Sequence, residues 1–175
     1  MNPRRFLRAG ALAMTAFALS GCGYHVAGQS SILPKEVHTI AIAPWTNVSI
    51  HYTLSNYLAA AVSREFISRS RYRLISDVSK ADVVLYGSVA NMTSGGTIFD
   101  NTAQRTTAGQ ITVQIQYRLV DHAGKVLVSK PNVEFHERYQ ISINPGQYFD
   151  ESEAAIERLS VDVAKDVVSS ILEQF

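Results

Sequence analysis

The clearest pattern in this 175-residue chain is a strict alternation of apolar and polar side chains from position 111 to position 119. Ile, Val, Tyr and Leu occupy the odd positions, and Thr, Gln and Arg occupy the even ones. A period of two predicts an antiparallel strand with one buried face and one polar face. A turn is expected at 121–124, followed by a return strand over about 125–143 that is interrupted near Pro131.

Two other segments have the apolar spacing of helices that bury one side. These predicted helices run from about 51 to 68 and from about 150 to the end of the chain. Val37 to Ala43 is rich in β-branched residues and stops at Pro44, which predicts a buried strand. After it, 46–49 is expected to turn the chain. A short strand is expected at 72–75 and a longer one at 82–92.

The predicted order of elements is β-α-β-β-β-β-α. An α+β fold follows: a two-layer sandwich in which two helices pack on one face of a four- to five-stranded mixed or antiparallel sheet. The opposite face of that sheet is expected to be relatively polar and available to a partner.

The segment from Thr93 to Gly109 is rich in Ser, Thr, Gly, Asn and Gln. This composition predicts a long connecting loop, and loops of such length are usually functional or mobile. Within it, Ser94-Gly95-Gly96-Thr97 has the small residues of a phosphate-binding turn. It lacks the following Lys and helix start, so a flexible loop tip is expected there.

The first 21 residues have the pattern of an export signal. Arg4, Arg5 and Arg8 precede an apolar run over 9–19, and the run is far shorter than the roughly 20 residues that span a bilayer. We therefore expect a removed signal peptide at 1–21, a lipidated tether at 22–36 and a single α/β sandwich domain at 37–175.

The expected cleavage region reads Leu19-Ser20-Gly21-Cys22 and resembles the bacterial lipobox. In such proteins the Cys thiol receives a diacylglyceryl group, and the new amine is acylated after cleavage. Cys22 is the only Cys of the chain, so it cannot form an intrachain disulfide. The alternative is an ordinary signal peptide followed by a free thiol. Gly23 occupies the position where an Asp would signal retention in the inner membrane, so the outer membrane is favoured.

Charge and motif searches give no sign of catalysis. Without its three signal arginines, the chain has thirteen basic and fifteen acidic residues, a formal charge of −2 that does not favour nucleic acid as a partner. The five histidines have no metal-ligand spacing, which leaves only a metal site assembled from distant residues. No nucleophile elbow occurs. We expect no cofactor and no enzymatic activity.

Several of these segments together resemble the LptE family of lipopolysaccharide-assembly lipoproteins. The most specific match is Gly21-Cys22-Gly23-Tyr24-His25-Val26, because that family typically begins its mature chain with Cys-Gly, an aromatic residue, His and an aliphatic residue. Weaker matches follow at the I-A-I strand, at the R-E-F helix end, at A-D-V-V-L-Y-G from Ala81 and in the closing helix from Glu153.

The resemblance implies a lipoprotein anchored to the inner leaflet of the outer membrane. Family members plug a large outer-membrane β-barrel, LptD, assist its folding and help deliver lipopolysaccharide to the cell surface. They also bind lipopolysaccharide through basic residues. By region alone, the counterparts here are Arg105, Lys125 and Lys130, whose alternative role is that of solvated surface charges.

Two other classes of protein are open at this stage. The A-P-W-T-N-V segment after the first strand, followed by a helix and A-D-V-V-L-Y-G, also resembles lipoproteins that activate cell-wall synthases or form curli-secretion pores. These too are non-enzymes, but their partners are peptidoglycan synthases or copies of themselves. A periplasmic hydrolase is the third class.

Overall fold

The computed structural model describes residues 33–34, 36–49, 51–102, 104–141 and 151–173. In chain order, its elements are β1 (Thr39–Ile42), β2 (Thr46–Asn47), α2 (Leu54–Arg69), β3 (Arg73–Leu74), a 3-10 helix η1 (Val78–Lys80), β4 (Val83–Asp100), β5 (Arg105–Asp121), β6 (Val126–Gln140) and α3 (Ser152–Leu172).

The strands form one mixed sheet in the order β3-β1-β4-β5-β6. β1 pairs in parallel with β3 and β4, whereas β4, β5 and β6 pair antiparallel. The α+β class and the mixed sheet are therefore confirmed. One detail of the prediction was wrong: Thr46 and Asn47 do not simply turn the chain. They form β2, which pairs in parallel with Ser88 and Val89 of β4 because β4 supplies a free edge beyond the end of β1.

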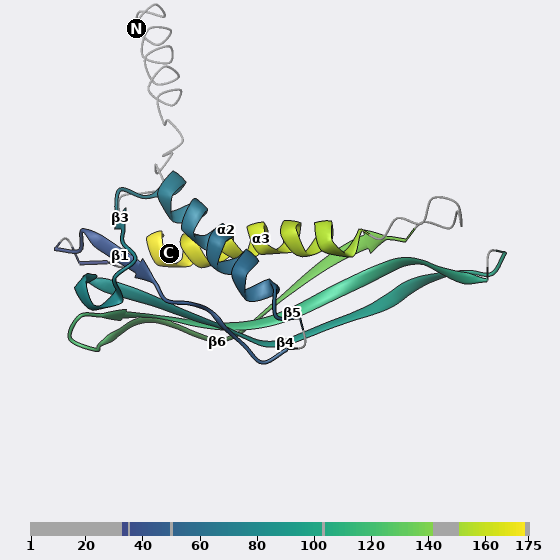
Figure 1. Cartoon of the computed structure of the whole chain (residues 1–175), viewed down its shortest axis with the longest axis horizontal. Coiled ribbons are helices and arrows are strands. Elements are labelled where there is room, and N and C mark those ends of the chain that lie inside the picture. The colour runs from purple at the N-terminus through teal and green to yellow at the C-terminus, as the bar shows by residue number, and fades with distance from the viewer. Residues whose placement is uncertain (1–32, 35, 50, 103, 142–150, 174–175) are drawn as a thin grey trace, which may run out of the picture.

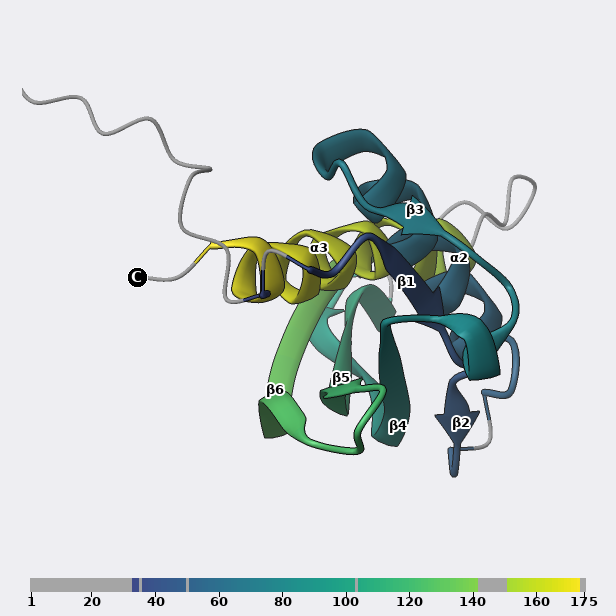
Figure 2. The ribbon, with the colours of Figure 1, turned by 90° about the vertical axis from the view of Figure 1, so that its left-hand side faces the viewer.

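Both helices lie on the same side of the sheet, as predicted (Figures 1 and 2). The stripe of α2 buries Leu58, Val62 and Phe66, and that of α3 buries Leu159, Val163, Val167 and Ile171. They meet the odd-numbered side chains of β5 from Ile111 to Leu119, each at most 3% exposed. A fully buried aliphatic side chain contributes roughly 1.5–3 kcal/mol, so this shared core holds the two layers together.

The expected loop at 93–109 is largely strand, which corrects the prediction. β4 and β5 pair through this segment, with Ser94 opposite Ile111 and Gly96 opposite Gly109. Backbone pairing with the long β5 outweighs the low strand preference of the Ser, Thr and Gly residues. Ser94 to Thr97 is thus inside β4, which ends only at Asp100, and β5 begins at Arg105. We call residues 93–109 the hairpin arm, because it projects beyond both helices (Figure 1).

The interruption predicted near Pro131 is confirmed. Ile115 pairs with Val133 but Tyr117 pairs with Lys130, so Pro131 and Asn132 together lie opposite Gln116 as a bulge. Proline has no N–H to donate to a neighbouring strand and is tolerated at such irregularities.

Asp82, just before β4, fixes the start of β1. Its Oδ2 accepts hydrogen bonds from the backbone N–H of His38 (2.9 Å) and of Thr39 (2.8 Å), and from the Thr39 hydroxyl (2.8 Å). The Thr39 hydroxyl oxygen in turn accepts from the Asp82 backbone N–H at 3.0 Å. These hydrogen bonds, led by that from His38, stabilise the charged carboxylate and hold the pKa of Asp82 below its usual value.

Replacing Asp82 with Ala should lower the free energy of unfolding at pH 7 by about 1–3 kcal/mol, because the His38 and Thr39 donors lose their acceptor. The folded-state pKa is depressed, so the stabilisation is complete above the unfolded-state pKa of about 3.9 and is lost as pH falls through the folded-state pKa. Urea denaturation between pH 7 and pH 2 should therefore show the two proteins converging at low pH. Asp162→Ala, at an exposed position of α3, is the control. A difference that does not change with pH would contradict this role.

Gly87 of β4 makes room for Trp45. A Cβ added at Gly87 would overlap the Trp45 ring, which is only 6% exposed and packs in the main core. The chain approaches β4 at this point because β2 pairs with it immediately after Trp45. The absence of a side chain at Gly87 thus allows Trp45, in the segment between β1 and β2, to pack closely against β4.

Gly87→Ala should therefore lower the free energy of unfolding by about 1–3 kcal/mol, because a buried indole cannot move away without disturbing the core. Gly95→Ala is the matched control in the same strand, since a Cβ at Gly95 would meet nothing within 4 Å. Trp45 is the only tryptophan of the chain, so its fluorescence during chemical denaturation reports on this contact directly. Equal losses in the two variants would show that the close approach is unimportant.

Candidate binding surface

The sheet face turned away from the helices is polar over β4, β5 and β6, as the alternation in 111–119 predicts. Opposite residues in the antiparallel register share a face, so this surface can be followed from strand to strand. We call it the open face, and it consists of Tyr86, Ser88, Asn91, Thr93, Gln110, Thr112, Gln114, Gln116, Arg118, Ser129, Glu134, His136 and Arg138.

Side chains of the open face bond to one another across the strands. Gln114 Nε2 donates to Glu134 Oε2 at 2.7 Å, and Thr112 Oγ1 lies 3.0 Å from His136 Nδ1. The other His136 nitrogen, Nε2, is 3.1 Å from Glu134 Oε1. These contacts link four residues of β5 and β6 into one network, which orders the side chains of the surface before any partner arrives.

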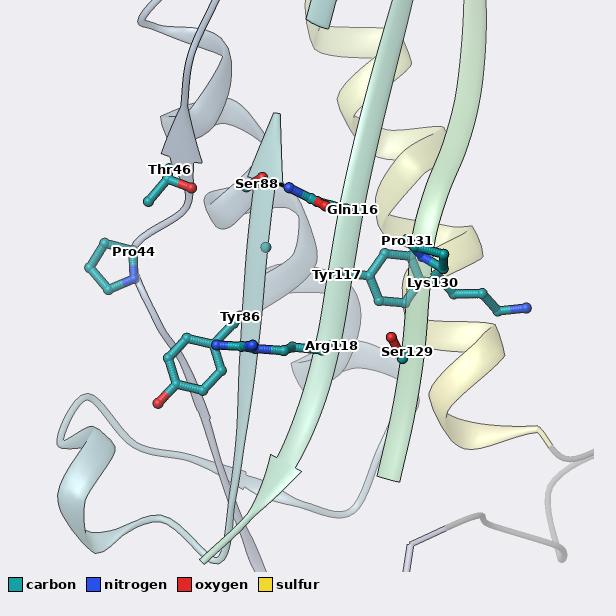
Figure 3. Close-up of a pocket in the computed structure, with 11 residues that line it drawn as sticks. Pro44, Thr46, Tyr86, Ser88, Gln116, Tyr117, Arg118, Ser129, Lys130 and Pro131 are labelled. Carbon is teal, nitrogen blue, oxygen red and sulfur yellow. Dashed lines mark hydrogen bonds between the residues drawn. The ribbon is translucent and has the colours of Figure 1, made fainter. Parts of the chain in front are cut away.

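A shallow pocket of about 470 Å³ lies on the open face, near the end of the sheet opposite the hairpin arm (Figure 3). Its floor is formed by β4, β5 and β6, and its sides by the segment around β2 and by the bulge in β6. We call it the open-face pocket, and its lining residues are Pro44, Thr46, Tyr86, Gly87, Ser88, Gln116, Tyr117, Arg118, Ser129, Lys130 and Pro131.

The dominant charged group in this pocket is the guanidinium of Arg118. It extends from β5 across β4 and lies over the Tyr86 ring, 5.3 Å from the ring centroid (Figure 3). This is the range of a favourable cation–π contact. Beside it, Gln116 Nε2 donates to Ser88 Oγ at 3.0 Å. No acidic residue lines the pocket.

Tyr117 connects the floor of the pocket to the helix layer. Its side chain points to the opposite side of the sheet, where its hydroxyl lies 2.7 Å from Ser170 Oγ of α3. Burial raises the pKa of the Tyr117 phenol above its ordinary value, so the group is neutral at physiological pH. The strand beneath Arg118 is therefore fixed to α3.

The structure separates the residues that the resemblance suggested for lipopolysaccharide. Arg105 begins β5 on the hairpin arm, opposite Asp100, whereas Lys125 lies in the turn after β5. A 17-residue strand is roughly 50 Å long, so these two residues are at opposite ends of the sheet. Lys130 lines the open-face pocket, but its side chain points away from Arg118 (Figure 3). Cys22 lies outside the described residues.

The described residues contain no group of three or more His, Cys, Asp or Glu side chains placed to hold a metal ion. Within the same ranges, no helix has both the length and the apolar character to cross a membrane.

The sequence pattern does not predict the open-face pocket. It placed Arg118 on the polar face of β5, but it could not place Tyr86 beneath the guanidinium. That neighbourhood depends on the register that puts Tyr86 opposite Arg118 and Arg118 opposite Ser129. One sequence signal could have indicated this contact: Tyr86 and Arg118, an aromatic residue and a cation, lie in two segments that both predict strands.

Several solved structures share this fold. A lipoprotein B from Nitrosomonas europaea has a TM-score of 0.57 at 13% identity, over 86% of this chain and 91% of that one. Protein XCC0632 from Xanthomonas campestris has a TM-score of 0.56 at 14% identity, over 85% and 90% of the two chains. The rare lipoprotein B from Shewanella oneidensis has a TM-score of 0.50 at 12% identity, over 72% and 91%. At these identities the likeness concerns the fold alone.

A family model identifies the sequence more specifically. No match was found among curated proteins. The model described as LptE, lipopolysaccharide-assembly, matches residues 37–171, which is most of the chain and the whole of the described sheet and helix layers apart from the last helical residue. This match confirms the resemblance to the LptE family. It favours that family over the synthase activators and curli-secretion lipoproteins that the first half of the chain also resembles. The chain belongs to the LptE family of lipopolysaccharide-assembly lipoproteins.

Proposed function

We propose that this protein is an outer-membrane lipoprotein that plugs an LptD-like β-barrel, assists the assembly of that barrel and helps to insert lipopolysaccharide into the outer leaflet. The single observation that carries the proposal is the family match over residues 37–171. The family is non-enzymatic, and we extend that property to this chain. Its role is then to bind and to position, which makes the shape and polarity of its surfaces decisive.

Lipid attachment at Cys22 supplies the membrane anchor in this proposal. Sixteen residues, 23–38, lie between Cys22 and the start of β1. Even fully extended, such a segment reaches at most roughly 60 Å. Two or more acyl chains hold a protein stably at a membrane, so the domain would be confined to a thin layer beside the outer membrane.

The open face and the hairpin arm suit the interior of a barrel. The lumen of a large outer-membrane barrel is polar, so an inserted protein must offer polar groups rather than an apolar patch. The hydrogen-bonded side chains of β5 and β6 meet that requirement. The arm adds a narrow two-stranded extension that reaches past the helices (Figure 1).

Arg105, Lys125 and Lys130 are proposed contacts for the anionic groups of lipopolysaccharide. Because Arg105 is roughly 50 Å from Lys125 along β5, the three do not form one cluster. We therefore assign Arg105 to a contact at the arm, and Lys125 with Lys130 to a separate contact at the other end of the sheet.

Cys22→Ala should abolish lipid attachment and leave the precursor unprocessed, because the thiol is the group that is alkylated. Because the chain has a single cysteine, labelled palmitate that growing cells attach to the protein through a thiol reports on this residue alone. Gel mobility separates the precursor from the mature form and so reports on cleavage. His25→Ala, just past the cleavage region, is the control and should be processed normally. Normal processing of Cys22→Ala would remove the anchor from the proposal.

A photo-crosslinking residue at Thr93 or Gln114 should capture an outer-membrane β-barrel protein in intact cells. Both positions belong to the open face, and the proposal places that face against the barrel wall. Asp162, on the exposed side of α3, serves as the comparison position and should give less of that product. Mass spectrometry identifies the partner. Capture of a peptidoglycan synthase, or of copies of this protein alone, would overturn the proposed function in favour of the rival class.

A further inference from the structure

Among the described residues, Arg118 is one of several cations that form no ion pair, and no acidic residue lines its pocket. Ion pairs in those ranges involve Arg69, Lys80, His136, Arg158 and Lys165. Arg118 belongs to none of them, and the lining of the open-face pocket contains no Asp or Glu. A guanidinium is always charged at physiological pH, so this pocket has an uncompensated positive charge.

The contact with Tyr86 orders the guanidinium without using its donors. The Arg118 Cζ lies over the Tyr86 ring, 5.3 Å from the ring centroid, and a guanidinium has five N–H donors in one plane. The contact thus restricts the position of the guanidinium, and such a group can bind an oxyanion through two parallel hydrogen bonds.

Apart from Lys130, whose side chain points away from Arg118, the rest of the pocket lining is neutral (Figure 3). Ser88 accepts a hydrogen bond from Gln116, which leaves the Ser88 O–H able to donate. The hydroxyls of Thr46 and Ser129 also line the pocket, and Pro44 and Pro131 add apolar surface at its two sides. A volume of about 470 Å³ is within the usual range for small-molecule sites, roughly 300–1,000 Å³.

We infer that the open-face pocket binds an oxyanion carried on a small hydroxylated ligand, of the class of sugar phosphates and sugar acids, with Arg118 as the anion-binding residue. The hydroxyls of Thr46, Ser88 and Ser129 bond to the sugar. The pocket itself stands on its own geometry. Only the natural carrier, the saccharide of lipopolysaccharide, rests on the proposed function. The site is distinct from Arg105 on the arm, but it adjoins the proposed contact at Lys130, which lines the same pocket.

The test is titration calorimetry on the full chain in detergent with glucose 6-phosphate, glucuronate and uncharged glucose as probes. Both anionic probes should bind, and glucose should bind at least tenfold more weakly. Arg118→Gln should weaken the two anionic probes at least tenfold, Arg118→Lys should lose less, and Arg138→Gln should bind as the native chain does. Arg138 is the matched control because it is on the open face but outside the pocket.

Tyr86→Leu provides a second variant, since it removes the stacking partner but keeps the cation. It should weaken the anionic probes by less than Arg118→Gln does. Arg118 is exposed, so the thermal unfolding midpoint should be unchanged in its variants. Equal binding by the native chain and Arg118→Gln, or equal loss in Arg138→Gln, would overturn the inference and leave Arg118 as a solvated surface charge.

A parallel titration with lipopolysaccharide and with its dephosphorylated form identifies the carrier. Weaker binding of intact lipopolysaccharide by Arg118→Gln would place the saccharide in this pocket. If lipopolysaccharide binds but no probe does and Arg118→Gln has no effect, the inference fails while the proposed function stands. If the small probes bind through Arg118 and lipopolysaccharide does not bind at all, the pocket stands and that part of the proposed function fails.

Discussion

One-sided burial of the sheet is the constraint on which the other features depend. Both amphipathic helices pack on the same face, so the odd-numbered side chains of β5 from Ile111 to Leu119 are almost fully enclosed, while the even-numbered ones between them face outward. Polar groups on an uncovered face must bond to water or to one another. Here many bond to one another across β5 and β6, and the result is an ordered polar surface rather than a collection of mobile side chains.

The same constraint explains where binding functions can be located. One face of the sheet is covered by the two helices and the core. On the opposite face near β1, Ala41, Ala81 and Val84 are buried in a small second cluster, against which η1 packs. What is left is the stretch of β4, β5 and β6 that includes the open-face pocket at one end and the hairpin arm at the other. A protein of this family can thus contact one partner along the strands and a small ligand in the pocket without disturbing its core.

Family membership and fold contribute different parts of this account. The solved neighbours share the architecture at 12–14% identity, and a fold shared at that level can support many functions. The link to lipopolysaccharide assembly comes from the family match, and the particular chemistry comes from residues such as Arg118 and Tyr86. The fold, the family match and the individual residues each limit the functions that the protein can have. Only the individual residues identify the groups that would contact a ligand.

Local periodicity determined much of this protein in advance: the two helices, the alternating faces of β5, the break at Pro131 and the polar open face can all be derived from the sequence, because side-chain direction depends on neighbouring residues alone. The hairpin arm could not, because its Ser, Thr and Gly residues have little strand preference and form strand only by pairing with β5. The strand register, a long-range property, placed Tyr86 under Arg118, and the pairing of β2 with β4 placed Trp45 over Gly87. The full length of β5 placed Arg105 far from Lys125. In the periodic segments, the sequence therefore determined which face each residue occupies, and tertiary structure decided which residues are neighbours on that face.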